Sequence, residues 1–412
     1  MKIAFTFCVV FALLMTACSE KKPVDRMTDL QLRAFAEELA HRFIITDGHV
    51  DLPEYLKKIK FDIDKGDMSF IVKTDSGEFD FTRAKKGGLD APFMSIYIPK
   101  TYQSLPDHGK GLADSLIHMV VEIAKQLPAK FVLANAVEDV EKNFKEGKIS
   151  LPMGMENGAP IGDDIKNVKY FYDQGIRYIT LTHSKDNQIC DSSGDTTHTW
   201  NGLSAYGREV VKEMNRVGIM VDISHVDDST FYQVMKLSKA PCIASHSSCR
   251  TFAPTVKRDM TDDMIKKLGK NDGVVMVNFY NAFLSGVVAD QNALLESLLK
   301  SKGLKTSDLL AKPIMKQYRQ DHPISIPDVS TVANHIDHVV KLAGIDHVGF
   351  GSDFDGVDGA DNLPTGLKDA SQYPNLIYEL LKRGYTEDDI QKICSGNIFR
   401  VWRRVAEIAR KS

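Results

Sequence analysis

Eight short apolar runs are spread along the chain, and each of them ends in a polar, mostly ionisable residue. Runs of this length that are rich in β-branched residues, and that are separated by segments long enough for a helix, are typical of buried parallel strands. Eight such units predict a closed (β/α)8 barrel, a fold that takes about 250 residues or more as one domain. The runs cover residues 44–49, 93–97, 151–156, 178–183, 220–225, 242–246, 274–278 and 347–353.

The residues that end these runs are expected to meet in space. In a closed barrel the carboxyl ends of all strands converge on one face, and that face holds the active site. The candidates at the run ends are His49, Glu156, His183, His225, His246 and Asp353. Imidazole and carboxylate groups gathered in one place are the ligands and acid–base groups of metal-dependent hydrolases. The pattern therefore predicts a hydrolase as well as a barrel.

Composition limits the size of the core and the choice of partners. The chain has 412 residues, 43% of them hydrophobic, which is enough for a large core. The formal net charge is −3 and no basic stripe is present, so nucleic acid is not an expected partner. No internal repeat or interdomain linker interrupts the chain, and residues 29–412 are therefore expected to form a single domain.

Segments between the runs predict the remaining elements. Residues 29–43 have helical spacing and predict a lead-in helix, and residues 374–410 predict two amphipathic helices that close the outside of the barrel. Residues 57–86 are polar and carry Asp-Lys-Gly-Asp and Asp-Ser-Gly-Glu turn signals, which we interpret as a β-hairpin insertion over the barrel top. Residues 284–326 are too long for a plain crossover and predict extra helices on the rim. Crossover helices are expected at 111–126, 165–174, 204–217, 229–237, 262–268 and 329–342.

The N-terminus has the features of a targeting segment. A basic residue precedes an apolar stretch, residues 3–14, that is too short to cross a bilayer. The following Leu-Met-Thr-Ala-Cys resembles the lipobox of bacterial lipoproteins, with Cys18 as the lipidated residue. We expect residues 1–18 to be a signal peptide and residues 19–28 a tether, so that the mature protein is exported and lipid-anchored to the membrane of the cell envelope, on its periplasmic or outer face. An ordinary secretory signal cleaved near Ala17 is the alternative.

Four cysteines follow this segment, namely Cys190, Cys242, Cys249 and Cys394. Their spacing shows neither a CxxC motif nor a dense disulfide framework. Cys242 lies inside an apolar run and is expected to be a core thiol. One disulfide is compatible with an exported protein, and the sequence leaves its pairing open.

Several of the run-end residues have spacings that suit metal binding. His49 and Asp51 are two apart on one strand, so both point to the same side and can hold one cation. Glu156 is flanked by glycines, which let an ion approach closely, and His225 and His246 end consecutive runs. Taken alone, Glu156 is better explained as a rim salt bridge, and His225 or His246 as a hydrogen-bonded core histidine. Together they suit zinc, and a carboxylate between two half-sites can bridge two ions about 3.5–4 Å apart.

Seven motifs occur in a fixed order along the chain. They are DGHVDLP at 47–53, GME at 154–156, LTHS at 181–184, DISHV at 222–226, ASHSS at 244–248, MVNFY at 276–280 and GSDFDG at 351–356. In these motifs the chain resembles the membrane dipeptidase family, the renal-type M19 metallopeptidases, from about Phe43 to the C-terminus. The resemblance implies a (β/α)8 barrel of the metal-dependent hydrolase type and, together with the lipobox, a bacterial lipoprotein member of the family.

The resemblance also assigns roles to the metal ligands. His49 and Asp51 would bind one zinc ion, His225 and His246 would bind the other, and Glu156 would bridge the two. A hydroxide held between the metals would attack the carbonyl of a dipeptide. The implied activity is a zinc-dependent dipeptidase that needs a free C-terminal carboxylate on its substrate and tolerates a D-residue at that position. The family also implies a homodimer.

Further residues take roles from the same resemblance. His183 would polarise the oxygen of the tetrahedral intermediate, and Asp353 would take a proton from the attacking water and deliver it to the leaving amine. Arg258 would clamp the terminal carboxylate of the substrate, a task that the neighbouring Lys257 could share. Asp355 is either a turn carboxylate or a supporting group.

The chain departs from the family pattern at three places. Val50 stands where the family usually has asparagine, Arg258 is followed by aspartate where Arg-Asn is common, and residues 184–188 differ near the expected substrate mouth. These differences bear on hydrogen bonds behind the ligands and on the choice of substrate side chains.

Two alternative functions remain. One is another amidohydrolase-type barrel, such as a deaminase or lactonase, although those usually carry His-x-His on the first strand. The other is a non-catalytic surface lipoprotein that binds peptides.

Overall fold

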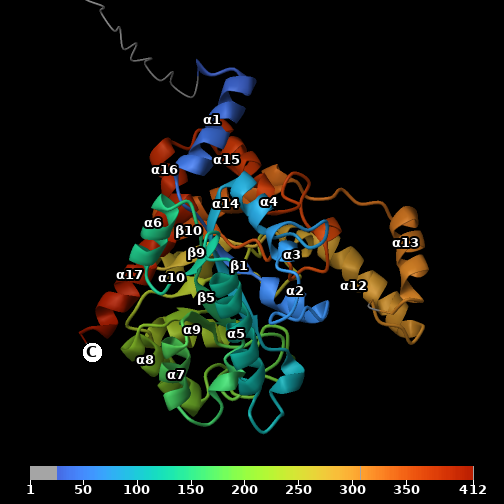
Figure 1. Ribbon diagram of the computed structural model, residues 1–412. Coiled ribbons are helices and arrows are strands. Elements are labelled where there is room, and N and C mark those ends of the chain that lie inside the picture. The colour runs from blue at the N-terminus through green and yellow to red at the C-terminus, as the bar shows by residue number, and fades with distance from the viewer. Residues whose placement is uncertain (1–25, 307, 412) are drawn as a thin grey trace, which may run out of the picture.

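Eight parallel strands close into a barrel in the order β1-β10-β9-β8-β7-β6-β5-β2. The computed structural model describes residues 26–306 and 308–411 (Figure 1). The strands are β1 (Ile45–Val50), β2 (Leu89–Tyr97), β5 (Met153–Glu156), β6 (Ile176–Thr180), β7 (Met220–Asp222), β8 (Ile243–Ala244), β9 (Val274–Val277) and β10 (Val348–Phe350). Each predicted run supplies one strand, and the predicted (β/α)8 barrel is confirmed.

The strands are apolar runs because the barrel interior covers one face and the helices cover the other. Every residue of β1, β5 and β6 is buried. Several strands end before the predicted runs do: β6 ends at Thr180 and β7 at Asp222, so that His183 and His225 stand in the loops just beyond. These two histidines therefore lie in the loops at the mouth of the barrel, whereas His49 and Glu156 lie within β1 and at the end of β5.

Helices surround the barrel and connect its strands. They are α1 (Asp29–Arg42), α2 (Leu52–Lys58), α3 (Ser69–Val72), α4 (Phe81–Gly87), α5 (Lys110–Gln126), α6 (Val137–Lys145), α7 (Lys166–Asp173), α8 (Ala205–Val217), α9 (Asp228–Leu237), α10 (Asp262–Lys270), α11 (Asn281–Leu284), α12 (Gly286–Ser301), α13 (Ala311–Asp321), α14 (Val329–Ala343), α15 (Tyr373–Lys382), α16 (Glu387–Gln391) and α17 (Asn397–Ala409). Side-chain caps set several starts: Thr28 begins α1 with a capping box, and Ser204, Asp227 and Thr261 accept backbone N–H groups at the starts of α8, α9 and α10. The predicted lead-in helix is confirmed.

The predicted β-hairpin at 57–86 is wrong. This segment holds the end of α2 and the short helices α3 and α4, joined by turns. The turn signals themselves are correct, because the chain turns at residues 63–66, where the carbonyl of Asp62 accepts the backbone N–H of Lys65 at 3.3 Å, and bends at residues 75–78, where Gly77 has φ 66°. The apolar side chains of this segment, such as Ile63, Ile71 and Phe79, pack into the core from turns and short helices, so no strand pair forms here.

The β addition to the barrel comes from a different part of the chain. A small parallel pair, β3 (Phe131–Leu133) and β4 (Ile149–Leu151), packs beside the barrel. The rim helices expected within 284–326 are present as α12 and α13. These two helices pack on each other through a small cluster of their own and extend away from the barrel (Figure 1).

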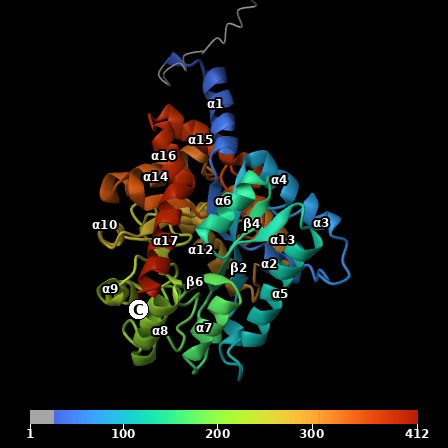
Figure 2. The ribbon, with the colours of Figure 1, turned by 60° about the vertical axis from the view of Figure 1, so that its left-hand side comes forward.

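The C-terminal region closes the outside of the barrel. Two helices were predicted, but the structure has three, α15, α16 and α17, with a π-helical turn at Lys392–Gly396 between the last two. Helix α17 runs along the outside of the barrel and contacts α6 and α8 (Figure 2). Its Trp402 packs on Phe93 of β2 with ring centroids 5.3 Å apart, so this helix covers the barrel wall.

All four cysteines in the described part of the chain are free and buried, so none of them forms a disulfide. Among the described residues, no helix combines the length and the apolarity needed to cross a membrane. The expected signal peptide and Cys18 lie outside the described residues, as does most of the expected tether.

Candidate active site and metal centre

Tyr178 sets the orientation of His49 from across the barrel. Nδ1 of His49 lies 2.8 Å from the Tyr178 hydroxyl, which itself donates to the carbonyl oxygen of Gly48 at 3.0 Å. Because the hydroxyl gives its only hydrogen to Gly48, Nδ1 donates to the hydroxyl and Nε2 keeps a free lone pair. The tyrosine ring fits there because residue 154 is glycine, since a Cβ on Gly154 would lie 2.0 Å from the ring. Sequence reasoning did not find Tyr178.

A second relay orients His246. The Ser245 hydroxyl lies 2.7 Å from Nδ1 of His246 and donates to Oδ2 of Asp222 at 2.6 Å. Asp222 is fully buried and also accepts the backbone N–H groups of Ser224 and Ser245. Nδ1 of His246 therefore donates to Ser245, and Nε2 is the nitrogen left free. Both relays present an unprotonated Nε2 to the barrel mouth, as metal-binding histidines do.

Glu156 lies between two groups of ligand atoms. Its Oε2 is 3.4 Å from Nε2 of His49, and its Oε1 is 3.0 Å from Nε2 of His225 and 3.4 Å from Nε2 of His246. Oδ2 of Asp51 lies 3.3 Å from Nε2 of His49. One oxygen of Glu156 thus faces each group, which is the arrangement that lets a carboxylate bridge two cations. The structure brings together all five residues expected to bind metal.

The polar atoms of this cluster fit cations better than they fit one another. The Nε2 atoms of His225 and His246 lie 2.9 Å apart. Within the described residues, His49 Nε2 and Asp51 Oδ1 are buried with no hydrogen-bond partner. Buried lone pairs of this kind are costly unless something satisfies them. Imidazole and carboxylate donors suit zinc and related divalent ions, so the donor set fits a metal centre.

The protonation states suit the same purpose. Burial and the positive charge of Arg258 hold the pKa of His225 well below its usual range. Burial, together with His49 and Arg258, lowers the pKa of His246 to about 3. Burial alone would raise the pKa of Glu156, but the surrounding histidines outweigh it and hold that pKa well below its ordinary value. Neutral imidazoles at His225 and His246 beside an ionised Glu156 are the forms that bind metal. Burial alone would lower the pKa of His49, but Tyr178, Asp51 and Glu156 outweigh it and raise that pKa well above its usual range.

Asp353 stands in the loop directly after β10. Its backbone is in the left-handed region, at φ 66°, which few residues other than glycine adopt. Its Oδ2 accepts the side-chain amide of Asn278 at 2.9 Å. A Cβ on Gly356 would lie 2.7 Å from Oδ1 of Asp353 and 2.3 Å from Oδ2 of Asp51, so glycine there allows the two carboxylates to approach. Burial raises the pKa of Asp353 to about 7, a value that suits proton transfer.

His183 joins the cluster from the loop after β6. Its Nε2 lies 3.6 Å from Oε1 of Glu156, and its Nδ1 lies 3.5 Å from the Tyr97 hydroxyl. Burial lowers the pKa of His183, so the imidazole is neutral near pH 7. The hydroxyl of Ser192 donates to the carbonyl of His183 and ties the loop down. A neutral imidazole held at the mouth in this way can donate a hydrogen bond to a substrate oxygen.

Arg258 reaches the cluster from the loop after β8. Its Nη1 donates to the hydroxyl of Ser247 and its Nη2 donates to the carbonyl of His246, each at 2.5 Å. Burial lowers the pKa of this guanidinium, but the ordinary pKa of arginine is so high that the group stays charged near pH 7. The neighbouring Lys257 is exposed. Arg258 is therefore the cation that lies beside the histidines.

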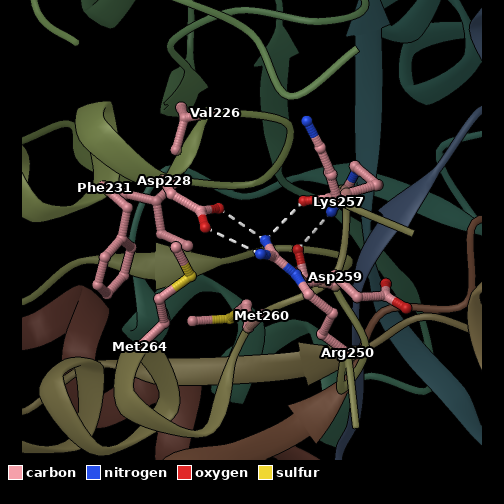
Figure 3. A pocket seen from close by; sticks show the side chains of 11 residues that line it. Val226, Asp228, Phe231, Arg250, Lys257, Asp259, Met260 and Met264 are labelled. Atoms are coloured by element: carbon pink, nitrogen blue, oxygen red, sulfur yellow. Dashed lines mark hydrogen bonds and ion pairs between the residues drawn. The ribbon is translucent and has the colours of Figure 1, made fainter. Parts of the chain in front are cut away.

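Arg250 holds this loop in place. Its guanidinium faces the carboxylate of Asp228 (Figure 3), whose oxygens accept from Nη1 at 2.8 Å and from Nη2 at 2.7 Å, and it also donates to two backbone carbonyls. These are the carbonyls of Lys257 and Asp259, each at 2.8 Å from an Arg250 nitrogen. Because they belong to the residues on either side of Arg258, Arg250 fixes the backbone around it. Sequence reasoning missed this residue, and its position beyond the ASHSS motif carried no signal for such a role.

Two buried aspartates support the site without entering it. Asp47 accepts the backbone N–H groups of His49 and Ser352, at 2.9 and 3.0 Å, and the hydroxyl of Tyr373, which ties β1 to the loop that holds Asp353. Burial raises the pKa of Asp47 to about 6. Asp355 lies outside the ligand cluster, and its Oδ1 accepts a backbone N–H from the segment between α3 and α4.

Comparisons with known proteins agree with this geometry. A model of the membrane dipeptidase family, peptidase family M19, matches residues 33–412. An uncharacterized dipeptidase of Schizosaccharomyces pombe is 31% identical over 377 residues, which is 89% of this chain and 82% of the yeast protein.

Solved structures share the fold. The probable dipeptidase PvdM from Pseudomonas aeruginosa is 26% identical with a TM-score of 0.78, over 92% of this chain and 100% of that chain. Dipeptidase AC, a metallo peptidase of family M19, is 25% identical with a TM-score of 0.71, over 88% of this chain and 98% of that chain.

Proposed function

The chain belongs to the membrane dipeptidase family of metallopeptidases, and on that premise we propose that it is a zinc-dependent dipeptidase whose substrates carry a free C-terminal carboxylate. The observation that carries the proposal is the position of Glu156, with one oxygen facing His49 and the other facing His225 and His246. A cluster of this kind beside a buried guanidinium suits a short peptide better than a neutral ester or amide.

The ligands divide into two sets around Glu156. His49 and Asp51 would hold one cation, His225 and His246 would hold the other, and Glu156 would contribute one oxygen to each. When bound, the two cations supply Lewis acidity for the scissile carbonyl and acidify water toward neutral pH. Zinc is the ion we propose, because three histidines, an aspartate and a glutamate form a borderline-hard ligand set that suits it.

Arg258 binds the terminal carboxylate of the substrate. Each of its Nη nitrogens uses one hydrogen on the protein, at Ser247 and at the carbonyl of His246, and has a second hydrogen for a ligand. A planar guanidinium matches the two oxygens of a carboxylate. Because the clamp lies next to the metal ligands, the carboxylate it holds belongs to the residue just past the scissile bond, and longer peptides are excluded.

Asp353 and His183 carry out the remaining steps. Asn278 occupies Oδ2 of Asp353, which leaves Oδ1 to take a proton from the attacking water and to deliver it to the leaving amine nitrogen. His183 donates from Nε2 to the carbonyl oxygen as that oxygen gains charge. The Tyr97 hydroxyl near Nδ1 supports this tautomer.

We also propose that the enzyme accepts a D-residue at the C-terminal position of its substrate, as the family resemblance implies. The test is hydrolysis of matched substrates by the chain that begins at residue 19: L-Ala-L-Ala, L-Ala-D-Ala, L-Ala-D-Ala amide and a tripeptide. We expect cleavage of both dipeptides with little cleavage of the amide or the tripeptide. Equal cleavage of L-Ala-D-Ala and its amide would contradict the role of Arg258 as a carboxylate clamp. Cleavage of L-Ala-L-Ala alone would contradict the tolerance for a D-residue.

The location and assembly are also proposals. We propose that Cys18 is lipidated, that the protein is held on the exported face of a cell-envelope membrane, and that it forms a homodimer. A Cys18→Ser variant is expected to leave the membrane fraction, whereas Cys242→Ser, a change at a buried thiol, is expected to stay there. Light scattering of the chain that begins at residue 19 is expected to give twice the mass of one chain.

A further inference from the structure

Glu78 and Asp355 form a buried pair that links two segments far apart in the chain. The backbone N–H of Glu78 donates to Oδ1 of Asp355 at 2.5 Å, and the backbone N–H of Asp355 donates to Oε2 of Glu78 at 2.9 Å. Glu78 is 4% exposed. A Cβ on Gly77 would lie 2.8 Å from the same oxygen of Asp355, so the two segments touch closely. Each carboxylate thus accepts the other's backbone N–H, and neither segment can move without the other.

The segment that presents Glu78 is itself firmly held. Asp80 accepts the backbone N–H and Nε of Arg83, at 2.8 and 2.7 Å, and Arg83 donates in turn to the carbonyl of Gly77 at 2.6 Å. The carbonyl of Glu78 accepts the backbone N–H of Ala370 at 3.0 Å. The side chain of Glu78 therefore projects from a rigid base rather than from a loose loop.

The segment that receives Glu78 carries the acid–base carboxylate. Asp353 and Asp355 both have left-handed backbones, at φ 66° and 67°. Gly356, the next residue, packs against the side chains of Asp51 and Asp353. Two left-handed non-glycine residues in so short a stretch persist only where surrounding contacts enforce them. The bonds from Glu78 are contacts of that kind.

We propose that Glu78 is a positioning residue for the dipeptidase reaction: it holds the backbone of Asp355 and thereby sets the position of the Asp353 carboxylate. This inference rests on the acid–base role proposed for Asp353. The segment between α3 and α4, which belongs to none of the seven motifs, thereby has a function. Asp355, whose role the sequence left open, is the residue through which Glu78 acts on Asp353.

The test replaces Glu78 by methionine, which keeps the buried volume and removes the acceptor. We expect Glu78→Met to lower kcat by between about 10- and 100-fold with little change in KM, because a small misplacement of a reacting group has effects of this size. Bound metal is expected to stay at the wild-type level. Glu78→Gln keeps an oxygen that can accept the N–H of Asp355 and is expected to restore most of kcat. Asp75→Ala removes an exposed carboxylate from the same loop and is the matched control.

A second readout does not depend on hydrolysis. Hydrogen exchange of the amides of residues 353–356 is expected to speed up in Glu78→Met and to stay at the wild-type rate in Asp75→Ala. If Glu78→Met fails to fold, Glu78→Asp, which is one methylene shorter, takes its place with the same expectations. The inference is overturned by a wild-type kcat in a folded Glu78 variant, by unchanged exchange at 353–356, or by a kcat that falls only in step with lost metal. If the wild-type chain cleaves no dipeptide, the proposed function is wrong. The exchange measurement would still decide whether Glu78 holds this loop.

Discussion

The Nε2 atoms of His225 and His246 lie 2.9 Å apart at the mouth of the barrel. Ser245 accepts the hydrogen of His246 at Nδ1, so Nε2 of His246 faces its neighbour with a lone pair. Both nitrogens also lie within 3.4 Å of one oxygen of Glu156. Three electron-rich atoms in so small a space are stable together when they share a cation.

Tyr178→Phe is expected to weaken metal binding. The change removes the hydroxyl that accepts from Nδ1 of His49 and leaves the ring in place. Loss of an orienting partner behind a metal-binding histidine typically costs 10- to 100-fold in affinity, about the decrease expected here. Competition with a chelator of known affinity measures it. Tyr170→Phe, which removes a hydroxyl bound to Asp114 away from the cluster, is the control. Equal metal affinity in the two variants would contradict the orienting role.

Asp353→Asn is expected to lower kcat while leaving the metal in place. The amide keeps the size of the side chain but cannot take up a proton, and loss of a general acid–base group typically costs about 10²- to 10⁴-fold. Steady-state kinetics with a dipeptide, together with metal analysis of the same sample, measures both effects. Asp358→Asn, an exposed change in the same loop, is the control. A loss of activity explained entirely by lost metal would move Asp353 from acid–base chemistry to metal binding.

Arg258→Lys is expected to act mainly on KM. Lysine keeps the charge but loses the planar pair of N–H groups that fits a carboxylate, and a charge-assisted hydrogen bond of this kind is worth about 10- to 100-fold in kcat/KM. The effect is expected for a dipeptide and to be small for its C-terminal amide, so the comparison of the two substrates is the measurement. Lys257→Arg, next to it and exposed, is expected to change neither. A similar loss on both substrates would show that Arg258 does not read the carboxylate.

His335 is expected to make stability depend on pH. It is buried on α14, its Nδ1 accepts the backbone N–H of Cys249 at 3.1 Å, and burial lowers its pKa from 6.5 to about 4. Because the unfolded chain takes up this proton at the higher pH, the free energy of unfolding falls as pH drops from about 6.5 toward 4, by about 2 kcal/mol at pH 5.

The matching variant is His335→Gln, which cannot titrate. Urea unfolding at about pH 7 and pH 5 is expected to show a pH-dependent loss smaller by about 2 kcal/mol than in the wild type. His118→Gln changes an exposed histidine and is expected to leave the loss unchanged. An identical loss in His335→Gln and the wild type would mean that His335 does not titrate between these values.

Four of the five proposed metal ligands could be predicted from the sequence because each of them ends its own apolar run, and the fifth, Asp51, lies two residues after His49. Once eight runs predict a closed barrel, topology alone brings His49, Glu156, His225 and His246 to one face, whatever their distance along the chain. The prediction needed no knowledge of side-chain packing. For this reason the predicted barrel and the predicted grouping of these four residues agree with the structure.

The residues behind the ligands could not be predicted in the same way. Tyr178 reaches His49 only because Gly154 leaves room for its ring, and Arg250 supports Arg258 through backbone carbonyls that no motif marks. The prediction of a β-hairpin at 57–86 was wrong for a related reason. Turn signals indicate where the chain reverses, but the elements between turns depend on how each segment packs on the barrel. Glu78, for example, is held there by contacts with Asp355 and Ala370.

The most direct measurement of the central claim is dipeptide hydrolysis as a function of bound metal. The chain that begins at residue 19 is stripped by a chelator and titrated with zinc, and kcat and bound zinc are followed together. We predict that the stripped protein is folded and inactive, and that activity returns as the cluster of His49, Asp51, Glu156, His225 and His246 fills, with full activity at two zinc ions per chain. Full activity in the metal-free protein, or no cleavage of any dipeptide by the zinc-loaded protein, would contradict the account.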